Sequence, residues 1–418
     1  RQVGRRAVPG RAGVGATGTV GTTFNRWRPN SAVLTGVVGY EGVGGGSTTS
    51  LDIRDTFEPR MLNVDIVSGG ENWNAYLQGS YDLHALGDAE VYAEALYSRR
   101  QSVQVGYRQL SLDYPDNSPL LPSQLWTTPN FSNASTYPNP APTGVTLPPA
   151  YATGVRAFIG FGNYDTSQDV TFNRYLAGIR GDFILPDWRY DLSFTYGRNE
   201  GEYTFESWLT DRLFHSLNVV TAPVGTPTNL VRNVNGTNYM CAVTATNPAY
   251  GCIPAPFLSN QVIAGTAFPQ NWVDWTFVPV VGMSVYTEST IAAAIDGPVM
   301  DLPAGQVMAA FGLEYRDAEI DDTPDYNSVN NNLYNLTAST PTRGTDTVTE
   351  VFGEVEIPVL ADQPLAEALS VNLSARYTDY DSYGADWTHK VGVLYRPIDG
   401  LSFRGTQGTS YRAPALFE

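Results

Sequence analysis

The ordered stretches of this chain alternate between apolar and polar residues with a period of two. From Tyr190 to Tyr196 every second residue is apolar, and the residues between them are polar. A period of two places one set of side chains on each face of a β-strand. The same pattern recurs over residues 73–81, 89–97, 307–315, 351–357, 371–377 and 391–395. Helical periodicity is nearly absent, and residues 361–369 are the one short candidate helix.

The segments between these strands alternate in length. Short connections are expected at residues 83–88, 185–188, 297–305, 358–368 and 397–400. Long ones are expected at 101–169, 199–287 and 317–347, with a brief one on the same side at 380–388. Tight turns at one end and long loops at the other are typical of an up-and-down outer-membrane barrel. We count about a dozen strands, two of them before Phe57.

A soluble sandwich also has one apolar face per sheet, but its polar faces meet water and carry many Lys and Glu residues. In a transmembrane barrel the apolar face meets lipid and the polar face lines the lumen. Here charged residues make up only 16% of the 418 residues, and Lys390 is the only lysine. We therefore predict an all-β fold: an antiparallel up-and-down transmembrane β-barrel with long extracellular loops and short periplasmic turns.

Charge and composition exclude several classes of protein. The formal net charge is −17, and residues 1–40 hold six Arg and no acidic residue. No basic stripe offsets the acidic remainder, so nucleic acid is excluded as the main partner. The chain has no run of about 18 apolar residues for a transmembrane helix. It opens with neither Met nor a signal peptide, so it reads as a processed protein or a fragment.

Cys241 and Cys252 are the only cysteines, and ten residues separate them in a stretch rich in Pro, Asn and Gly. Two thiols alone do not complete a structural zinc site. They form either a local disulfide in an exported protein or two free cytosolic thiols, and the first interpretation is favoured.

The last third of the chain resembles the barrel of TonB-dependent outer-membrane receptors. The most specific string is Ser-Tyr-Arg-Ala-Pro-Ala-Leu-Phe-Glu at residues 410–418. Its motif residues are Tyr411, Arg412, Ala413, Pro414, Phe417 and Glu418. Residues 301–316, 351–358, 376–380 and 390–397 are similar to other strands of the family, and looser similarity begins near Leu83. The resemblance also places Cys241 and Cys252 where many such receptors carry a loop disulfide.

The resemblance covers only part of such a receptor. A complete member has an N-terminal plug with a TonB box inside a barrel of about 22 strands. No plug is recognisable here, and the family pattern continues beyond Glu418. We expect a flexible Arg/Gly-rich lead-in over residues 1–30, with the tail of a missing plug as one interpretation. Residues 31–418 are then a partial barrel without its closing C-terminal strands.

Candidate catalytic and metal sites are weak. Residues 13–18 match G-x-G-x-x-G, but neither a strand before them nor a helix after them supports a dinucleotide site. His84, His215 and His389 lack metal-ligand spacing. The acidic residues of 321–325 form either a Ca²⁺ loop or, as we favour, a solvated turn. We predict no enzymatic activity, no catalytic residue, no metal and no cofactor.

Alternation also places charged side chains on the lumen-facing side of the predicted barrel. They are expected either to guide a polar substrate or only to be solvated. These residues are Arg376, Arg396, Arg404, Glu354, Glu356 and Asn372.

The resemblance implies energy-dependent uptake of a scarce nutrient across the bacterial outer membrane. Ferric siderophores, cobalamin, oligosaccharides and peptides remain open as substrates. The implied partners are outer-membrane lipid and the inner-membrane TonB–ExbB–ExbD complex, acting through the missing plug. The candidate ligand contacts are four loop aromatics: Trp126, Tyr137, Tyr239 and Trp272.

Two alternatives remain. One is a passive, plugless porin. The other is a secreted all-β binding module, which would suit the N-x-S/T glycosylation sites at Asn130, Asn133, Asn235 and Asn335.

Overall fold

The computed structural model describes residues 26–34, 38–44, 51–54, 62–115, 117–126, 136–137, 151–414 and 416. Fourteen strands form one large sheet. Its long strands are β4 (Gly69–Asp82), β5 (Glu90–Pro115), β7 (Tyr151–Asp182), β8 (Arg189–Trp208), β12 (Phe277–Leu302), β13 (Gly305–Thr323), β14 (Thr342–Gln363), β15 (Ala366–Tyr380), β16 (Gly384–Ile398) and β17 (Leu401–Gly408). Successive long strands pair antiparallel from β4 to β17, and among the described residues the sheet does not close on itself.

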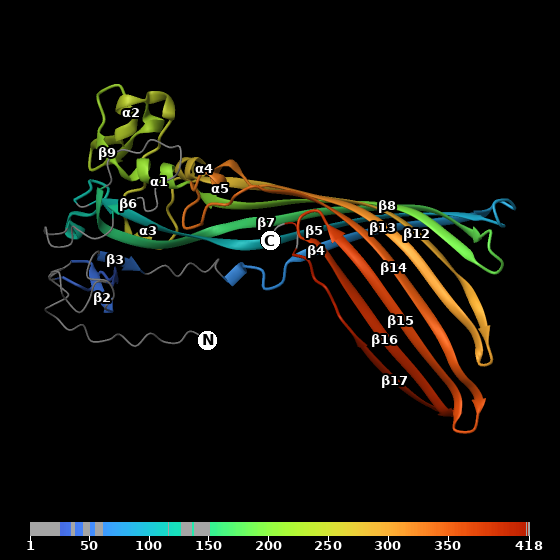
Figure 1. Cartoon of the computed structure of the whole chain (residues 1–418). Helices are drawn as coiled ribbons and strands as arrows, with labels where there is room; N and C mark the ends of the chain where they lie inside the picture. Colours follow the sequence, from blue (N-terminus) through green and yellow to red (C-terminus); the bar gives the residue numbers. More distant parts are fainter. Residues whose placement is uncertain are drawn as a thin grey trace.

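The long strands run side by side, with tight turns at one end and the long connections gathered at the other (Figure 1). We call these the turn end and the loop end. All stretches with two-residue alternation lie within strands, apart from Ala89, which directly precedes β5, and this confirms that prediction. The strands are longer than the stretches, and β5 continues to Pro115. The turns are tighter than expected, since residues 303–304, 364–365 and 399–400 suffice for three of them.

The prediction of a short helix at residues 361–369 is wrong. These residues form the ends of β14 and β15, where Ala361 pairs with Ala368 and Gln363 with Ala366. Cross-strand hydrogen bonds therefore satisfy backbone groups that a helix would have satisfied locally.

Helices occur instead in the long connections at the loop end. The connection between β8 and β12, residues 209–276, is called the cap below. It contains α1 (Thr210–Leu217), β9 (Val219–Thr221), β10 (Arg232–Val234), β11 (Thr237–Cys241), α2 (Ala242–Thr246), α3 (Asn260–Ile263), α4 (Gln270–Thr276) and 3₁₀ turns at Thr228–Leu230 and Pro248–Tyr250. Elsewhere lie a 3₁₀ turn at Ser123–Leu125, β6 (Thr136–Tyr137) and α5 (Tyr326–Val329). None of the helices in the described ranges is long and apolar enough to cross a membrane.

Three short strands near the N-terminus join the sheet at the loop end (Figure 1). They are β1 (Arg26–Pro29), β2 (Tyr40–Gly44) and β3 (Leu51–Arg54). The strand β3 pairs in parallel with β7 at Val155–Phe158, unlike the antiparallel long strands. Because β1 and β2 form a hairpin, the domain boundary expected at residue 30 falls within that hairpin. Residues 1–25, including the glycine motif at 13–18, lie outside the described residues.

Toward the turn end, the sheet has one apolar and one polar face. Leu192 and Phe194 of β8 are exposed on the apolar face, where Phe194 pairs with Ile291 of β12. Aromatic side chains form two bands on this face. The band farther from the turns contains Tyr97, Tyr175, Tyr315, Tyr377 and Trp387, and the band near the turns contains Tyr81, Tyr190, Phe311 and Phe403. Two aromatic bands around an aliphatic belt are the surface pattern of a transmembrane barrel.

The opposite face carries the charged side chains. The residues predicted for it by alternation all lie there: Arg376, Arg396, Arg404, Glu354, Glu356 and Asn372. Arg376 donates a hydrogen bond to Glu350 at 2.8 Å, and the Asn372 amide donates one to Glu354. Opposite charges therefore pair along this face.

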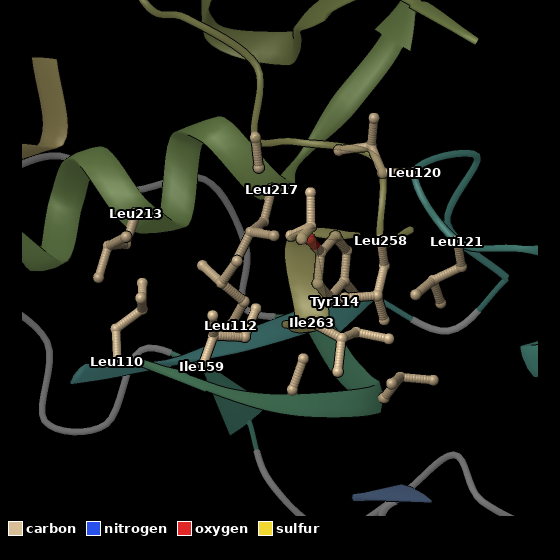
Figure 2. Packing of buried hydrophobic residues seen from close by; sticks show 14 of the residues in the cluster. Leu110, Leu112, Tyr114, Leu120, Leu121, Ile159, Leu213, Leu217, Leu258 and Ile263 are labelled. Atoms are coloured by element: carbon tan, nitrogen blue, oxygen red, sulfur yellow. The ribbon is translucent and has the colours of Figure 1, made fainter. Parts of the chain in front are cut away.

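The main hydrophobic core lies at the loop end (Figure 2). Leu110, Leu112 and Tyr114 of β5 pack there with Leu213 and Leu217 of α1. Burying an aliphatic side chain of this size contributes roughly 1.5–3 kcal/mol. The cap therefore covers one face of the β5–β7 hairpin and gives the loop end a core of its own.

Candidate ligand-binding cavity at the loop end

The strands β7 and β8 separate before they reach the loop end. Their ladder begins at the turn and stops at the pair Ser167–Thr204. Beyond this pair, β7 stays bonded to β5, and β8 stays bonded to β12. The two strand pairs leave an opening between them.

The connection between β13 and β14 borders this opening. Leu333 forms an isolated β-bridge with Leu209, and the Tyr334 N–H donates to the Trp208 carbonyl at 2.9 Å. Asn332 extends the contact, because its carbonyl accepts from the Thr210 N–H at 2.8 Å. Residues far apart in the sequence thus meet at the end of β8.

A cavity of about 700 Å³ occupies the opening. Ligand pockets in proteins typically measure roughly 300–1,000 Å³, so the space suits a small molecule or part of a larger one. Its lining residues are Tyr107, Arg108, Gln109, Leu110, Ser111, Phe158, Ile159, Gly160, Tyr164, Phe205, Glu206, Ser207, Trp208, Phe277, Tyr334, Asn335 and Leu336.

Aromatic rings make up much of the cavity wall. The Trp208 and Phe277 ring centroids are 4.6 Å apart, and the edge of Tyr164 meets Phe277 at 5.9 Å. Trp272 lies behind this wall, 5.6 Å from Trp208, and joins it to the core. The rings of this wall therefore pack against one another in the geometries that aromatic pairs prefer.

One ion pair lies in this aromatic wall. The Arg108 Nη2 atom is 3.0 Å from a Glu206 carboxylate oxygen, and the guanidinium carbon lies 4.5 Å from the Phe277 centroid. The two side chains keep 21% and 30% of their surface exposed, so a ligand can reach both. A hydrogen-bond donor, the Arg108 guanidinium, therefore lies beside a hydrogen-bond acceptor, the Glu206 carboxylate.

A bulge in the β5–β7 ladder positions this part of the wall. Tyr107 pairs with Asn163 and Gln109 pairs with Gly160, so β7 carries one extra residue here. Gly162 adopts a left-handed φ of +58°, which a residue with a side chain rarely adopts. A Cβ atom at position 160 would lie 2.5 Å from the Tyr107 ring, so only glycine leaves room for that ring. Bulges commonly redirect side chains in this way.

The disulfide and a hydrogen bond from Arg232 link parts of the cap, and a buried hydrogen bond joins the cap to β5. Cys241 and Cys252 are joined by an S–S bond of 2.07 Å, as the sequence suggested. The Tyr114 hydroxyl donates to the Pro256 carbonyl at 2.9 Å, and burial raises the pKa of this phenol, which keeps it a donor. Arg232 donates to the Pro254 carbonyl at 2.9 Å.

None of the four predicted ligand contacts lines the cavity. Trp126 is half exposed, and its indole N–H donates to the Ser118 carbonyl. Tyr239 is partly exposed on β11, opposite Arg232. Tyr137 pairs with Tyr151 through the backbone, and its side chain lies outside what the structure describes.

Trp272 requires a correction. It is fully buried against Trp208 and Phe268, so its ring offers no surface to a ligand in this structure. Its aromatic character reflects core packing, which sequence alone does not distinguish from ligand contact.

The C-terminal motif follows β17 and adopts no regular structure where it is described. The Tyr411 ring lies 5.8 Å from that of Tyr380. Tyr411 and Ala413 are partly buried, whereas Arg412 and Pro414 are exposed. Phe417 and Glu418 lie outside the described residues.

Sequence reasoning missed the cavity residues because it placed all of them in the three long connections. The signal that identifies them is a change of face along β5. Apolar residues occupy odd positions from Val91 to Tyr97 and even positions from Leu110 to Tyr114. Such a change marks the point at which a strand begins to bury its other face.

The structure contains a second depression, of about 1040 Å³, on the apolar face near the turn end. Leu192, Ile295, Phe311 and Leu313 are among its mostly apolar lining residues. This lining suits hydrocarbon rather than a polar nutrient.

Two of the three acidic residues at 321–325, Asp321 and Asp325, have protein partners. Asp321 pairs with Arg343 at 2.9 Å, which lowers the pKa of its carboxyl group. Asp325 caps α5 by accepting from the Asn327 N–H. Among the described residues, no three His, Cys, Asp or Glu side chains form a group that could hold a metal ion.

A comparison with protein families places most of this chain in a known group. Residues 113–418 match a family model described as TonB dependent receptor-like, beta-barrel. The match includes β7, β8 and every later long strand. No curated protein is similar enough to count as a match.

Proposed function

Because the chain belongs to the TonB-dependent receptor β-barrel family, whose members are outer-membrane transporters, we propose that it forms part of a receptor for TonB-linked nutrient uptake. The observation that carries this proposal is the family match over a sheet with a lipid-compatible face and an ion-paired polar face. The apolar face meets lipid and the polar face lines the lumen.

The two ends of the sheet set the orientation of the proposed receptor. The loop end, with the cap and the cavity, faces the outside of the cell, and the turn end faces the periplasm. Nutrient binds at the loop end, and the TonB–ExbB–ExbD complex supplies the energy through a plug. The family members are transporters rather than enzymes, so the bound molecule is transported without being chemically changed.

Surface labelling tests the location and the orientation. The gene is expressed from its natural coding sequence with single substitutions Val224→Cys in the cap or Asp399→Cys in a turn. Both positions are exposed. A membrane-impermeant maleimide should label the cap variant on intact cells and the turn variant only after the outer membrane is opened. Recovery in the culture medium would indicate a secreted module instead.

Uptake measurements test the energy coupling. Cells with and without the gene are compared for growth on ferric siderophores, cobalamin, oligosaccharides or peptides at limiting concentration. A nutrient that depends on the gene is then supplied to a strain that lacks TonB. Loss of uptake supports the proposal, whereas uptake that persists without TonB would indicate a passive pore.

A further inference from the structure

We propose that the cavity between the separated β7 and β8 strands binds an uncharged oligosaccharide. This inference deepens the proposed function, on which its role in uptake rests, by naming the class of nutrient. It depends on the charge, the ring content and the position of the cavity wall.

The cavity wall carries no net charge. Arg108 and Glu206 are its only charged lining residues, and they pair at 3.0 Å. The chain around them has a formal net charge of −17, which disfavours anionic ligands at long range. An acidic ferric complex would find no unpaired cation in this wall, and a cation would find no unpaired carboxylate. A neutral ligand needs no partner of opposite charge, so its binding carries no cost of desolvating an unpaired charge.

The wall also combines flat apolar rings with polar groups. Seven lining residues are aromatic. Three of them, Phe158, Tyr164 and Phe205, are partly exposed and can meet a ligand, whereas Trp208 is buried. Sugar rings present patches of C–H groups that stack on such rings, while their hydroxyls need donors and acceptors nearby. Gln109, Ser111 and other polar lining residues supply these.

The ion pair suits the hydroxyl groups of a sugar. The Arg108 guanidinium only donates hydrogen bonds, and the Glu206 carboxylate only accepts them. Two neighbouring sugar hydroxyls can satisfy this arrangement together, one accepting from Arg108 and the other donating to Glu206. Hydrogen bonds to charged groups are stronger than those between neutral groups. The pair is already in place, so little ordering is required when the ligand binds.

The test measures binding by calorimetry, using the receptor purified in detergent from its natural coding sequence. The probes are maltohexaose and xylohexaose as neutral sugars, hexagalacturonate as an acidic sugar, and ferric citrate. We expect at least one neutral sugar to bind and the acidic probes to bind at least tenfold more weakly. If neither neutral sugar binds, or if an acidic probe binds best, the inference is overturned.

Two matched substitutions locate the site. Glu206→Gln removes the acceptor charge inside the cavity, whereas Glu200→Gln removes a carboxylate on the same strand that pairs with Arg198 outside the cavity. The first should weaken neutral-sugar binding about tenfold or more, since hydrogen bonds to charged groups contribute about 1.5–3 kcal/mol. It should also reduce the ratio of neutral-sugar affinity to hexagalacturonate affinity, because Arg108 loses its carboxylate partner and can then bind an acidic sugar. The second should change neither property.

A further variant guards against misfolding of Glu206→Gln. Gln109 is exposed at the cavity, so Gln109→Ala should leave the fold intact and weaken sugar binding several-fold. If Gln109→Ala and Glu200→Gln leave binding equally unchanged, the sugar does not occupy this cavity.

The binding and uptake results separate the two proposals. Sugar binding with uptake that does not need TonB would overturn the proposed function and retain this inference. TonB-linked uptake of another nutrient, without sugar binding, would overturn this inference alone.

Discussion

The strand β5 carries its apolar residues on opposite faces in its two halves. Toward the turn end its apolar residues, such as Val91 and Tyr97, lie on the exposed apolar face of the sheet. Toward the loop end Leu112 and Tyr114 lie on the other face and are fully buried beneath the cap. One strand thus contributes to the apolar face of the sheet at one end and to the core beneath the cap at the other. The change in its apolar positions marks the boundary between these two environments.

The neighbouring strand β7 makes the same change by a different route. Its apolar residues occupy odd positions in both halves, as in Ile179 and Ile159. The bulge at Gly162 turns its face over, so that Ile159 pairs with Leu110 of β5. A change of pattern in one strand therefore matches an insertion in its partner.

The two halves consequently depend on different sources of stability. The turn-end half has a regular ladder and an apolar surface that, in the proposed receptor, only lipid covers. The loop-end half has a core, a disulfide and buried hydrogen bonds. Substitutions should therefore affect one half and leave the other in place.

The largest effect is expected in the cap core. Trp272→Ala removes a fully buried ring that contacts Trp208 and Phe268 and should destabilise the cap by about 3–5 kcal/mol. Limited proteolysis in detergent should then cut within residues 209–276 while the long strands stay protected. The matched control is Trp387→Ala, whose ring is 64% exposed on the apolar face. Equal protease sensitivity in both variants would show that the two halves are not independent.

A charge introduced on the apolar face should impair the long strands of the turn-end half rather than the cap. Leu192→Arg lies between the two aromatic bands and should cost about 2–4 kcal/mol on insertion into a bilayer. Thr195→Arg, on the polar face of the same strand, should cost little. Folding efficiency into lipid vesicles, followed by mobility on unheated gels, measures the difference. Equal folding of both variants would contradict the assignment of the apolar face to lipid.

Loss of the disulfide should loosen the cap by less. Replacing Cys241 and Cys252 together with serine removes a cross-link between residues eleven positions apart, a change expected to cost about 2–3 kcal/mol. Protease cleavage of the cap should become faster, and a reductant should have the same effect on the unsubstituted chain but none on the variant. If the reductant speeds cleavage of both, a process other than this disulfide is responsible.

The long strands were predictable because each residue type records the surface that it faces. Alternation from Tyr190 to Tyr196 sufficed for the turn-end half of β8, although the strand continues to Trp208, into the loop expected from residue 199. The loop-end half of β5 was missed because the apolar positions change parity before Leu110. Period-two reasoning treats that change as the end of a strand, although the backbone ladder continues to Pro115.

The cavity was not predictable by the same means. Its wall requires β7 and β8 to separate after Ser167, and it requires Tyr334 to lie beside Trp208 from a connection more than a hundred residues away. Neither contact leaves a local pattern. Loop aromatics such as Trp272 were therefore chosen by type, and that residue belongs to the core.

The smallest expected effect is a pH dependence confined to the cap. His215 is 3% exposed, its ring lies 4.9 Å from that of Tyr250, and its Nδ1 has no hydrogen-bond partner among the described residues. Burial lowers the pKa of this imidazole, although the nearby Asp211 carboxylate opposes the shift. Between the lowered pKa and the ordinary value near 6.5, the unfolded chain binds a proton that the folded cap does not. Cap stability should therefore fall as the pH drops below about 6.5, by at most about 1.4 kcal/mol per unit.

Proteolysis of the cap at pH 7.5 and 5.5 measures this change against His215→Gln, which does not titrate. The substitution should flatten the pH dependence of cleavage within residues 209–276, whatever it does to cleavage at the higher pH. His389 lies on the apolar face of β16, away from the cap, so His389→Gln should keep the full dependence. If His389→Gln also flattens the pH dependence of cleavage, this dependence does not arise from His215 alone. The two halves of the molecule would then not respond independently to pH.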